Sequence, residues 1–204
     1  MDIKDLITAR ASELFSKNGI RGVTMNDVSE TAGISKRTLY EHFSNKEALL
    51  TSCLRYEHSR SLELRTSIEE EARNIIDIIH RHFRHAVILI QEMHPGYLTE
   101  LQKLHPEVWK KEVEPLLHER DLYVVELVKR GIDQGVFRKN TDPHIVAKLL
   151  HAQVDLLADT RVFPLDRFLR ADVFRHIIMV FVRGIATSRG LQEIDALFSD
   201  QEKE

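Results

Sequence analysis

The sequence is poor in residues that interrupt helices and has almost no capacity for covalent cross-links. Its 204 residues include eight glycines, five prolines and one cysteine, Cys53. Because helix breakers are scarce and β-branched alternation is rare, the composition argues against a sheet-rich fold and favours an all-α one. The single cysteine excludes an intramolecular disulfide and is typical of a reducing compartment.

Long apolar runs and a strong net charge are also absent. The sequence has no apolar run of about 18 residues, and its N-terminal MDIKDL lacks the pattern of a signal peptide. We therefore expect a soluble, cytoplasmic protein with no membrane partner. Lys and Arg number 29 and Asp and Glu number 32, for a net charge of -3. Contact with nucleic acid must then depend on the placement of a few basic residues.

The most informative stretch begins at Thr24. Thr24 and Asp27 have the spacing of a capping box, which predicts that a helix begins directly after Thr24. Gly33 is suited to end that helix, because glycine readily adopts the left-handed conformation of a helix C-terminus. Ser35 is then a suitable N-cap for a second helix over residues 36–43. Two short helices joined by a glycine-containing turn form a helix-turn-helix.

Flanking helices are predicted to complete a three-helix domain around this motif. Residues 3–18 carry one apolar stripe, which is typical of an amphipathic helix packed behind the motif. Ser44 and Glu47 form a second capping pair, which predicts that a further helix starts between them. We therefore expect a helix-turn-helix domain at residues 1–47 and an effector-binding and dimerisation domain at residues 48–204.

The second helix of the motif carries the residues that predict a function. Leu39 and Phe43 are four positions apart and can anchor this helix to a core. Its other positions hold donors that can reach base edges and phosphates in the major groove. Thr24 precedes the first helix of the motif, and Lys46 lies at the start of the helix that follows the motif. Both lie near enough to these donors to contact DNA as well. The predicted DNA-contacting residues are Thr24, Ser35, Lys36, Arg37, Thr38, Tyr40, His42 and Lys46.

These residues resemble those of a known family. AGISKRTLYEHFSNKEALL is similar to the DNA-binding segment of the TetR (tetracycline repressor) family, and ITARASELFSKNGIRGVTMNDV is similar to its first helix and the lead into the second. The resemblance implies a prokaryotic homodimeric regulator with about nine helices, which binds a pseudo-palindromic double-stranded DNA operator. It also implies that Lys36, Arg37 and Thr38 lie at the bases, and that the phosphates are held by Thr24, Tyr40, His42 and Lys46.

Helical periodicity dominates the rest of the chain. Pro115 is expected to kink the longest helix, because proline removes one helical hydrogen bond. The last two helices have apolar faces that are wider than a helix with one solvent-exposed face needs. This predicts a homodimer seam formed by the helices near 143–160 and 172–188, with burial inside one subunit as the alternative. The other predicted helices cover residues 45–64, 69–93, 97–104 and 107–134.

Proline breaks on both sides of the short helix at residues 97–104 leave room for a cavity above the kinked helix. We expect this cavity to bind a small apolar effector. The alternative is that its candidate wall residues are ordinary core. Those candidates are Phe83, Val87, Tyr97, Leu101, Trp109 and Tyr123.

Two further features leave alternatives open. His80, His82 and His85 are spaced closely enough for a metal site, but solvated or capping histidines are the alternative. No second histidine pair supports a metal, so we expect neither a metal nor a cofactor. Cys53 could act as a redox switch or as a small buried hydrophobe.

These patterns predict a ligand-responsive, DNA-binding transcriptional regulator, in the form of a repressor that a small molecule releases from its operator. No enzyme is expected and no catalytic residue is assigned, because the sequence lacks HExxH, GxSxG and a phosphate-binding loop. The alternatives are a helical adaptor or an enzyme, each without DNA binding.

Overall fold

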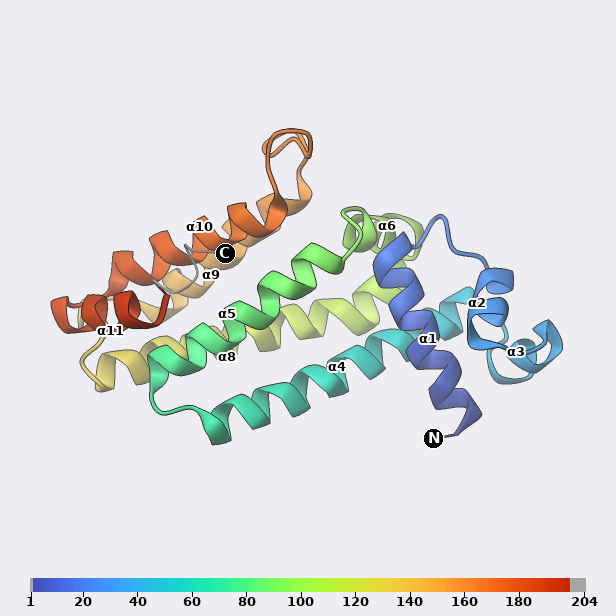
Figure 1. Cartoon of the computed structure of the whole chain (residues 1–204), viewed down its shortest axis with the longest axis horizontal. Helices are drawn as coiled ribbons and strands as arrows, with labels where there is room; N and C mark the ends of the chain where they lie inside the picture. The colour runs from blue at the N-terminus through green and yellow to red at the C-terminus, as the bar shows by residue number, and fades with distance from the viewer. Residues whose placement is uncertain (1, 199–204) are drawn as a thin grey trace. The chain divides into compact units, whose positions relative to one another are not determined.

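The computed structural model describes residues 2–198, and their regular secondary structure is helical (Figure 1). This confirms the all-α fold class. One isolated antiparallel bridge joins Phe137 and Ala186. In the described part of the chain, no helix combines the length and apolar character needed to cross a membrane. The elements are α1 (Ile3–Asn18), α2 (Met25–Ala32), α3 (Lys36–His42), α4 (Lys46–Glu71), α5 (Ile75–Glu92), α6 (Tyr97–Leu104), α7 (Pro106–Val108), the π-helical η1 (Trp109–Val113), α8 (Glu114–Asp133), α9 (Pro143–Asp155), the 3₁₀-helical η2 (Leu156–Ala158), α10 (Arg170–Ile185) and α11 (Ser188–Phe198).

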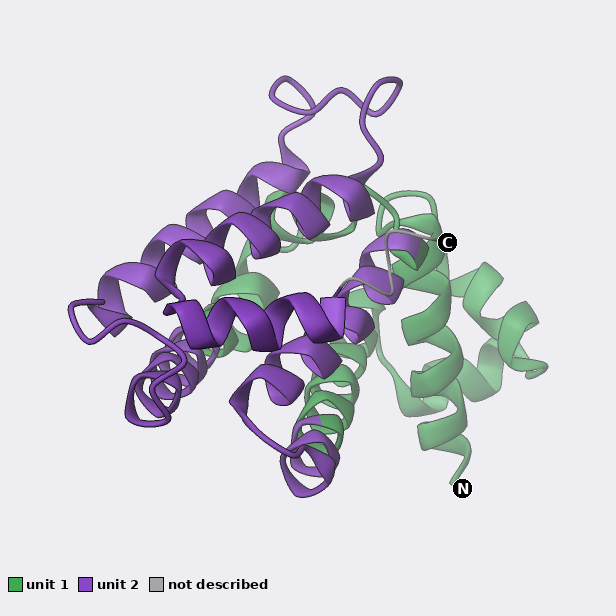
Figure 2. Ribbon diagram, turned by 60° about the vertical axis from the view of Figure 1, so that its left-hand side comes forward, with its two compact units in different colours: residues 1–64, 92–117 green, residues 65–91, 118–204 purple. Residues whose placement is uncertain are grey.

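The described chain forms two compact units, which Figure 2 shows in different colours. Unit 1 contains the chain up to Leu64 together with Glu92–Leu117, and unit 2 contains Arg65–Gln91 with the chain from His118 onward. The helix-turn-helix therefore shares a unit with α6, α7 and η1. The compact units differ from the predicted domains at residues 1–47 and 48–204, which are defined by function. Those domains stay a prediction.

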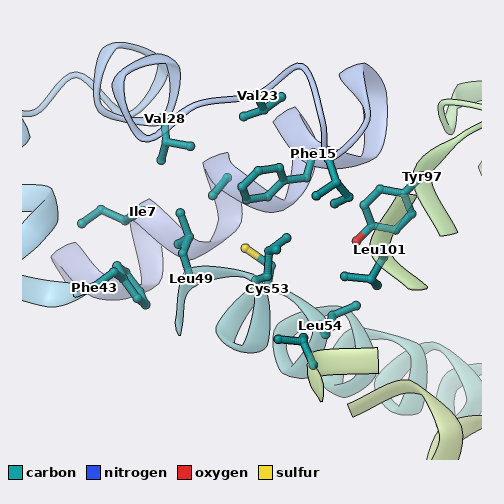
Figure 3. Packing of buried hydrophobic residues seen from close by; sticks show 14 of the residues in the cluster. Ile7, Phe15, Val23, Val28, Phe43, Leu49, Cys53, Leu54, Tyr97 and Leu101 are labelled. Atoms are coloured by element: carbon teal, nitrogen blue, oxygen red, sulfur yellow. The ribbon is translucent and has the colours of Figure 1, made fainter. Parts of the chain in front are cut away.

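The core of unit 1 is built on the apolar stripe of α1. Ile7, Ala11 and Phe15 are fully buried there, as the stripe predicted. Tyr97 and Leu101 bring α6 into the same cluster, whose packing Figure 3 shows. Because burial of a large apolar side chain contributes about 1.5–3 kcal/mol, this cluster is what holds α6 beside the three N-terminal helices.

The break between the fourth and fifth helices differs from the prediction. We expected one helix to end near residue 64 and the next to begin at Glu69, but α4 continues to Glu71 and α5 starts at Ile75. Residues 65–71 include no glycine or proline, so no helix breaker ends α4 earlier. Asn74 begins α5 instead, because its Oδ1 accepts the backbone N–H of Asp77 at 2.9 Å.

Pro115 does not simply kink one long helix. The five residues before Glu114 form the π-helical turn η1, and α8 starts at Glu114. The backbone N–H of Glu114 donates to the carbonyl of Trp109, five residues back. Proline has no backbone N–H to donate, and the chain accommodates this with a wider, π-helical turn. Such turns usually occur as single insertions within helices.

The C-terminal end of the described chain contains a helix that we did not predict. One helix was expected at residues 173–188, whereas α10 ends at Ile185 and α11 follows after Ala186 and Thr187. Thr187 accepts the backbone N–H of Gly190 through its side chain at 3.1 Å and so caps α11. A serine or threonine before a polar turn is a weak signal, which explains why the prediction ended at residue 188 and left out α11.

Candidate DNA-binding site

The turn that starts α2 has the predicted capping geometry. Thr24 donates its backbone N–H to Asp27 Oδ2 at 2.7 Å, and Asp27 donates its own to Thr24 Oγ1 at 3.3 Å. The hydrogen bonds from Thr24 lower the pKa of the Asp27 carboxyl. Gly33 ends α2 with φ 67° and ψ 33°, the left-handed conformation that glycine adopts without strain. Both ends of α2 are therefore as predicted.

The next helix, α3, is capped and anchored as predicted. Ser35 Oγ accepts the backbone N–H of Thr38 at 3.0 Å, and the two hydroxyl oxygens lie 2.9 Å apart. Leu39 is fully buried and Phe43 nearly so. Two buried anchors fix the helix about its own axis, so its other side chains face outward in a defined order.

The outward face of α3 carries most of the predicted DNA contacts. Lys36, Arg37 and Tyr40 are exposed, whereas Thr38 and His42 are half-buried. The Arg37 side chain is 88% exposed, and its Nε lies 3.0 Å from Glu41 Oε1. An exposed pair of this kind contributes little to stability, so Arg37 can exchange Glu41 for a base or a phosphate at small cost.

Lys46 lies differently from the other predicted contacts. Its ammonium donates to the backbone carbonyls of Ile20 and Val23 and lies 5.5 Å from the centre of the Phe15 ring. Burial lowers the pKa of Lys46, and the charges of Glu100 and Asp27 oppose that shift. The structure thus gives Lys46 a role in tying the start of α4 to the turn before α2. Its predicted phosphate contact stays a prediction.

The cap of α4 is not the predicted pair of Ser44 and Glu47. Asn45 Oδ1 accepts the backbone N–H of Ala48 at 2.8 Å and takes that place. Glu47 instead lies 3.2 Å from the imidazole Nδ1 of His105, which follows α6. The capping pattern located the helix start correctly, but two adjacent residues could serve as the cap.

Sequence patterns missed the way in which α6 holds the turn between α1 and α2. Glu100 accepts the backbone N–H of Arg21 at 2.8 Å, and the backbone N–H of His94 donates to the Ser16 carbonyl at 2.7 Å. A Cβ on Gly19 would lie 2.9 Å from both Glu100 Oε2 and His94 Nδ1, so glycine is needed at this contact. These partners are far apart in sequence, and no local pattern could have paired them.

Lys4 is a second residue that sequence reasoning left out of the site. Its ammonium lies 5.8 Å from the centre of the Phe43 ring, at the C-terminal end of α3. The side chain is exposed, so α1 adds a cation beside the recognition helix. Lys4 directly follows Ile3, the first residue of the apolar stripe, and this position gave no signal of its placement.

The six predicted effector-binding residues divide between the two units. Tyr97, Leu101 and Trp109 belong to the core cluster of unit 1 or pack against it. Phe83 and Val87 are buried in unit 2. In the same unit, the Tyr123 hydroxyl donates to Glu69 and lies 2.8 Å from His82 Nε2. The role of these residues in binding an effector stays a prediction.

Unit 2 contains an apolar cavity between helices α5, α8, α9 and α10. It encloses about 90 Å³ and is partly open to solvent, so it is smaller than the usual range of about 300–1,000 Å³ for small-molecule sites. Of the described residues, its walls include none of the six predicted above. The lining side chains are all hydrophobic: Ile79, Val124, Leu127, Val128, Phe137, Val146, Leu150, Ile178, Phe181, Val182 and Ile185.

The histidine group and the cysteine have other surroundings than a metal or redox site would need. His80 stacks edge-on against Phe198 with ring centres 4.8 Å apart, and His82 bonds Tyr123. Within residues 2–198, no three His, Cys, Asp or Glu side chains form a group that could hold a metal ion. Cys53 is fully buried, and burial raises the pKa of its thiol. A buried, protonated thiol is a poor nucleophile.

The described geometry therefore defines a class of protein, one with a helix-turn-helix whose second helix presents basic and polar side chains to solvent. Comparison with known proteins gives the family. The family model described as "Bacterial regulatory proteins, tetR family" matches residues 7–53. Residues 7–53 are therefore a DNA-binding segment of the TetR family type, and the chain is a DNA-binding transcriptional regulator. Its matched relatives are regulators and not enzymes, as expected.

Similarity to individual proteins extends over most of the chain. An HTH-type transcriptional regulator of Bacillus subtilis, YvaF, is 25% identical over 192 residues, which cover 93% of this chain and 97% of the relative. The repressor KstR2 of Mycobacterium tuberculosis is 24% identical over 143 residues, 69% of this chain and 72% of the relative. A TetR-family regulator of Agrobacterium tumefaciens superimposes with a TM-score of 0.74 at 17% identity, covering 91% of this chain and 98% of that one. At this identity the structural likeness shows the fold alone.

Proposed function

We propose that this regulator is a repressor, and that two copies place α3 in successive major grooves of a pseudo-palindromic operator. The observation that carries the proposal is the geometry of α3. One face is anchored by Leu39 and Phe43, and the other presents Lys36, Arg37 and Tyr40 to solvent. A helix in this state can enter a major groove without rearranging its own fold.

The two basic residues at the start of α3 are proposed to contact base edges with Thr38. Arginine and lysine suit guanine, and a threonine hydroxyl can pair with several bases. Thr24, Tyr40 and His42 are proposed to contact phosphates together with Ser35 and Lys46. For Ser35, Thr24 and Lys46 these contacts would come in addition to the capping and carbonyl bonds already described.

Dimerisation is proposed through α9 and α10. TetR-family regulators are dimeric, and each of these helices leaves large apolar side chains in contact with solvent. Ile145 and Leu149 on α9 are 58% and 53% exposed, and Val180 on α10 is 68% exposed. A two-fold pairing of these helices would cover all three in a four-helix seam near residues 143–160 and 172–188.

Release from the operator is proposed to follow binding of a small apolar effector within residues 48–204. Regulators of this family bind small-molecule effectors, and a solved structure of KstR2 describes it as a ketosteroid transcriptional regulator. The all-hydrophobic cavity of unit 2 supports an apolar effector. The effector must bind the DNA-released state more tightly than the DNA-bound state, since otherwise it shifts nothing. We propose that the protein acts in the cytoplasm, where its operator DNA lies.

The proposal is tested by gel shift with the DNA that flanks the regulator's own gene. We expect wild-type protein to bind a specific fragment and Arg37→Ala to lose specific binding by about tenfold to a hundredfold, as one good base contact contributes about 1–3 kcal/mol. Arg189→Ala is the matched control, because Arg189 also pairs an exposed guanidinium Nε with a glutamate four residues on, at 2.9 Å. Equal binding by all three proteins would show that α3 does not read the sequence.

A further inference from the structure

Arg120 on α8 is a cation with an unfilled hydrogen-bonding position. Its Nε is buried, and among the described residues it is the one buried side-chain nitrogen or oxygen without a hydrogen-bond partner. The nearest carboxylate, on Asp155, lies 3.8 Å from Arg120 Nη2 and is largely exposed. Burial lowers the pKa of Arg120, and the charges of Asp155 and Asp121 oppose that shift. Leaving a buried donor on a charged group unpaired costs free energy, so the site favours a further acceptor.

The other nearby carboxylate is already in use. Asp121 accepts from Lys148 Nζ and forms a hydrogen bond with His151 Nδ1. His151 is itself buried. Asp121 is therefore engaged by Lys148 and His151, and the buried Nε of Arg120 has no hydrogen-bond acceptor although Asp155 pairs with its Nη2.

The Arg120 side chain lies one turn from the wall of the apolar cavity. Val124 lines the cavity and is four residues after Arg120 on the same face of α8. The contacts from Arg120 to Asp155 and from Asp121 to His151 show that α8 and α9 run antiparallel at this point. Leu150 lines the same cavity and lies five residues before Asp155 on α9. An apolar cavity and an under-satisfied cation thus lie next to each other within unit 2.

We propose that unit 2 binds an amphipathic carboxylate, whose hydrocarbon part fills the apolar cavity and whose carboxylate pairs with the guanidinium of Arg120. This names the chemical class of the effector and rests on the proposed function. A carboxylate suits Arg120 because arginine and carboxylate form directed, charge-assisted hydrogen bonds. A phosphate would carry a second negative charge between Asp121 and Asp155, which disfavours it.

The first experiment measures binding of decanoate, methyl decanoate and decanol to the full chain by calorimetry. These probes share one hydrocarbon chain length and differ in the charge of the head group. We expect wild-type protein to bind decanoate about tenfold to a hundredfold more tightly than the ester or the alcohol, the range of a hydrogen bond to a charged group. Arg120→Gln should abolish this preference while leaving ester binding unchanged.

Arg175→Gln is the matched control. Its side chain is 39% exposed, as is that of Arg120, and it also pairs with one aspartate, Asp172. This variant should keep the preference for decanoate. Leu150→Trp fills the cavity and should weaken all three probes, with circular dichroism as the check that the helices are intact. Should Leu150→Trp lose its helices, Val146→Phe in the same wall takes its place.

Three results would overturn the proposal. They are equal binding of decanoate and its ester to wild-type protein, an unchanged preference in Arg120→Gln, and no binding of any probe. Binding that survives a filled cavity would also contradict it, because the chain would then occupy another surface. The gel shift on the same samples keeps the two proposals apart. Specific DNA binding without decanoate binding would reject the effector class and leave the regulator proposal standing.

Discussion

The helix-turn-helix and the α8–α9 region differ in how far apart in sequence their defining polar contacts lie. The caps of α2 and α3 join residues three positions apart, Thr24 with Asp27 and Ser35 with Thr38. In unit 2 the comparable contacts join Glu69 to Tyr123 and Asp121 to His151, which are 54 and 30 positions apart. The helix-turn-helix is built from local contacts and can be recognised in one sequence, whereas the arrangement of unit 2 depends on distant contacts and cannot.

The comparison can be tested first at the core of the helix-turn-helix. Leu39 is fully buried, so Leu39→Ala should lower the free energy of unfolding by about 2–5 kcal/mol. Leu98 on α6 is 42% exposed, and Leu98→Ala should cost much less. Urea unfolding followed by circular dichroism measures both. Similar losses for the two variants would mean that the anchor of α3 contributes no more than a surface residue.

In unit 2 a glycine gives a direct steric test. A Cβ on Gly131 would lie 2.2 Å from the ring of Phe137, which lines the apolar cavity. Gly131→Ala should therefore displace the ring and lower the free energy of unfolding by about 1–3 kcal/mol. Gly184→Ala is the control, because no atom lies within 4 Å of its Cβ position and α10 would gain helix propensity.

The opposite ranking of these two glycine variants in thermal unfolding would contradict the packing of Phe137 against α8. A loss in both would mean that alanine is unfavourable at Gly184 as well, and the effect of the Phe137 contact would then not be isolated. The pair thus separates a specific contact in unit 2 from a general effect of alanine.

Substitution of Lys46 tests whether this residue, which follows the helix-turn-helix, supports the fold, the DNA contact or both. Lys46→Met removes the donor to the Ile20 and Val23 carbonyls, so the free energy of unfolding should fall by about 1–2 kcal/mol. Lys36→Met, on the exposed face of α3, should leave unfolding nearly unchanged. If Lys46 also contacts a phosphate, Lys46→Met should make the slope of log K against log salt shallower by about one.

These two measurements are independent. An unchanged salt slope with reduced stability would assign Lys46 to the fold alone and remove it from the set of DNA contacts. An unchanged stability would show that water replaces the ammonium at both carbonyls without cost.

Sequence patterns predicted the three N-terminal helices closely, because the residues that begin and end these helices are close together in sequence. The bounds of α1, the start of α2 at Met25, the left-handed Gly33 and the Ser35 cap all follow from spacings of a few residues. The misplaced cap of α4, at Asn45 instead of Ser44, is a shift of one residue between two side chains that can both accept a hydrogen bond.

The remainder of the chain was predicted less well for physical reasons. Periodicity finds an apolar stripe but does not show which stripes meet, so it could not place Phe137 beside Gly131 or Arg120 beside Asp155. Tyr97 and Leu101 satisfy the pattern of a cavity wall and that of a core equally well, and in the structure they belong to the core cluster of unit 1. Composition cannot separate these outcomes, because both need buried apolar surface.

The smallest effect we predict concerns the buried histidine of unit 2. Burial lowers the pKa of His151, Arg120 acts in the same direction, and Asp121 and Asp155 oppose the shift. Lys148 also faces the group through its contact with Asp121. Since the folded pKa is lower than the unfolded value of about 6.5, the unfolded state binds more protons when the pH falls past that value. Stability should therefore decrease on acidification through this window.

His151→Gln should reduce the difference between the unfolding temperatures at pH 7.5 and pH 5.5, because it removes the group that takes up the proton. His144→Gln, at the exposed start of α9, should leave that difference as in the wild type. Asp121 does not interfere, since its pKa is lowered from a value that is already below this window. A larger difference in His151→Gln than in the wild type would mean that Asp121 stabilises the protonated imidazole, and the sign of the shift would then be reversed.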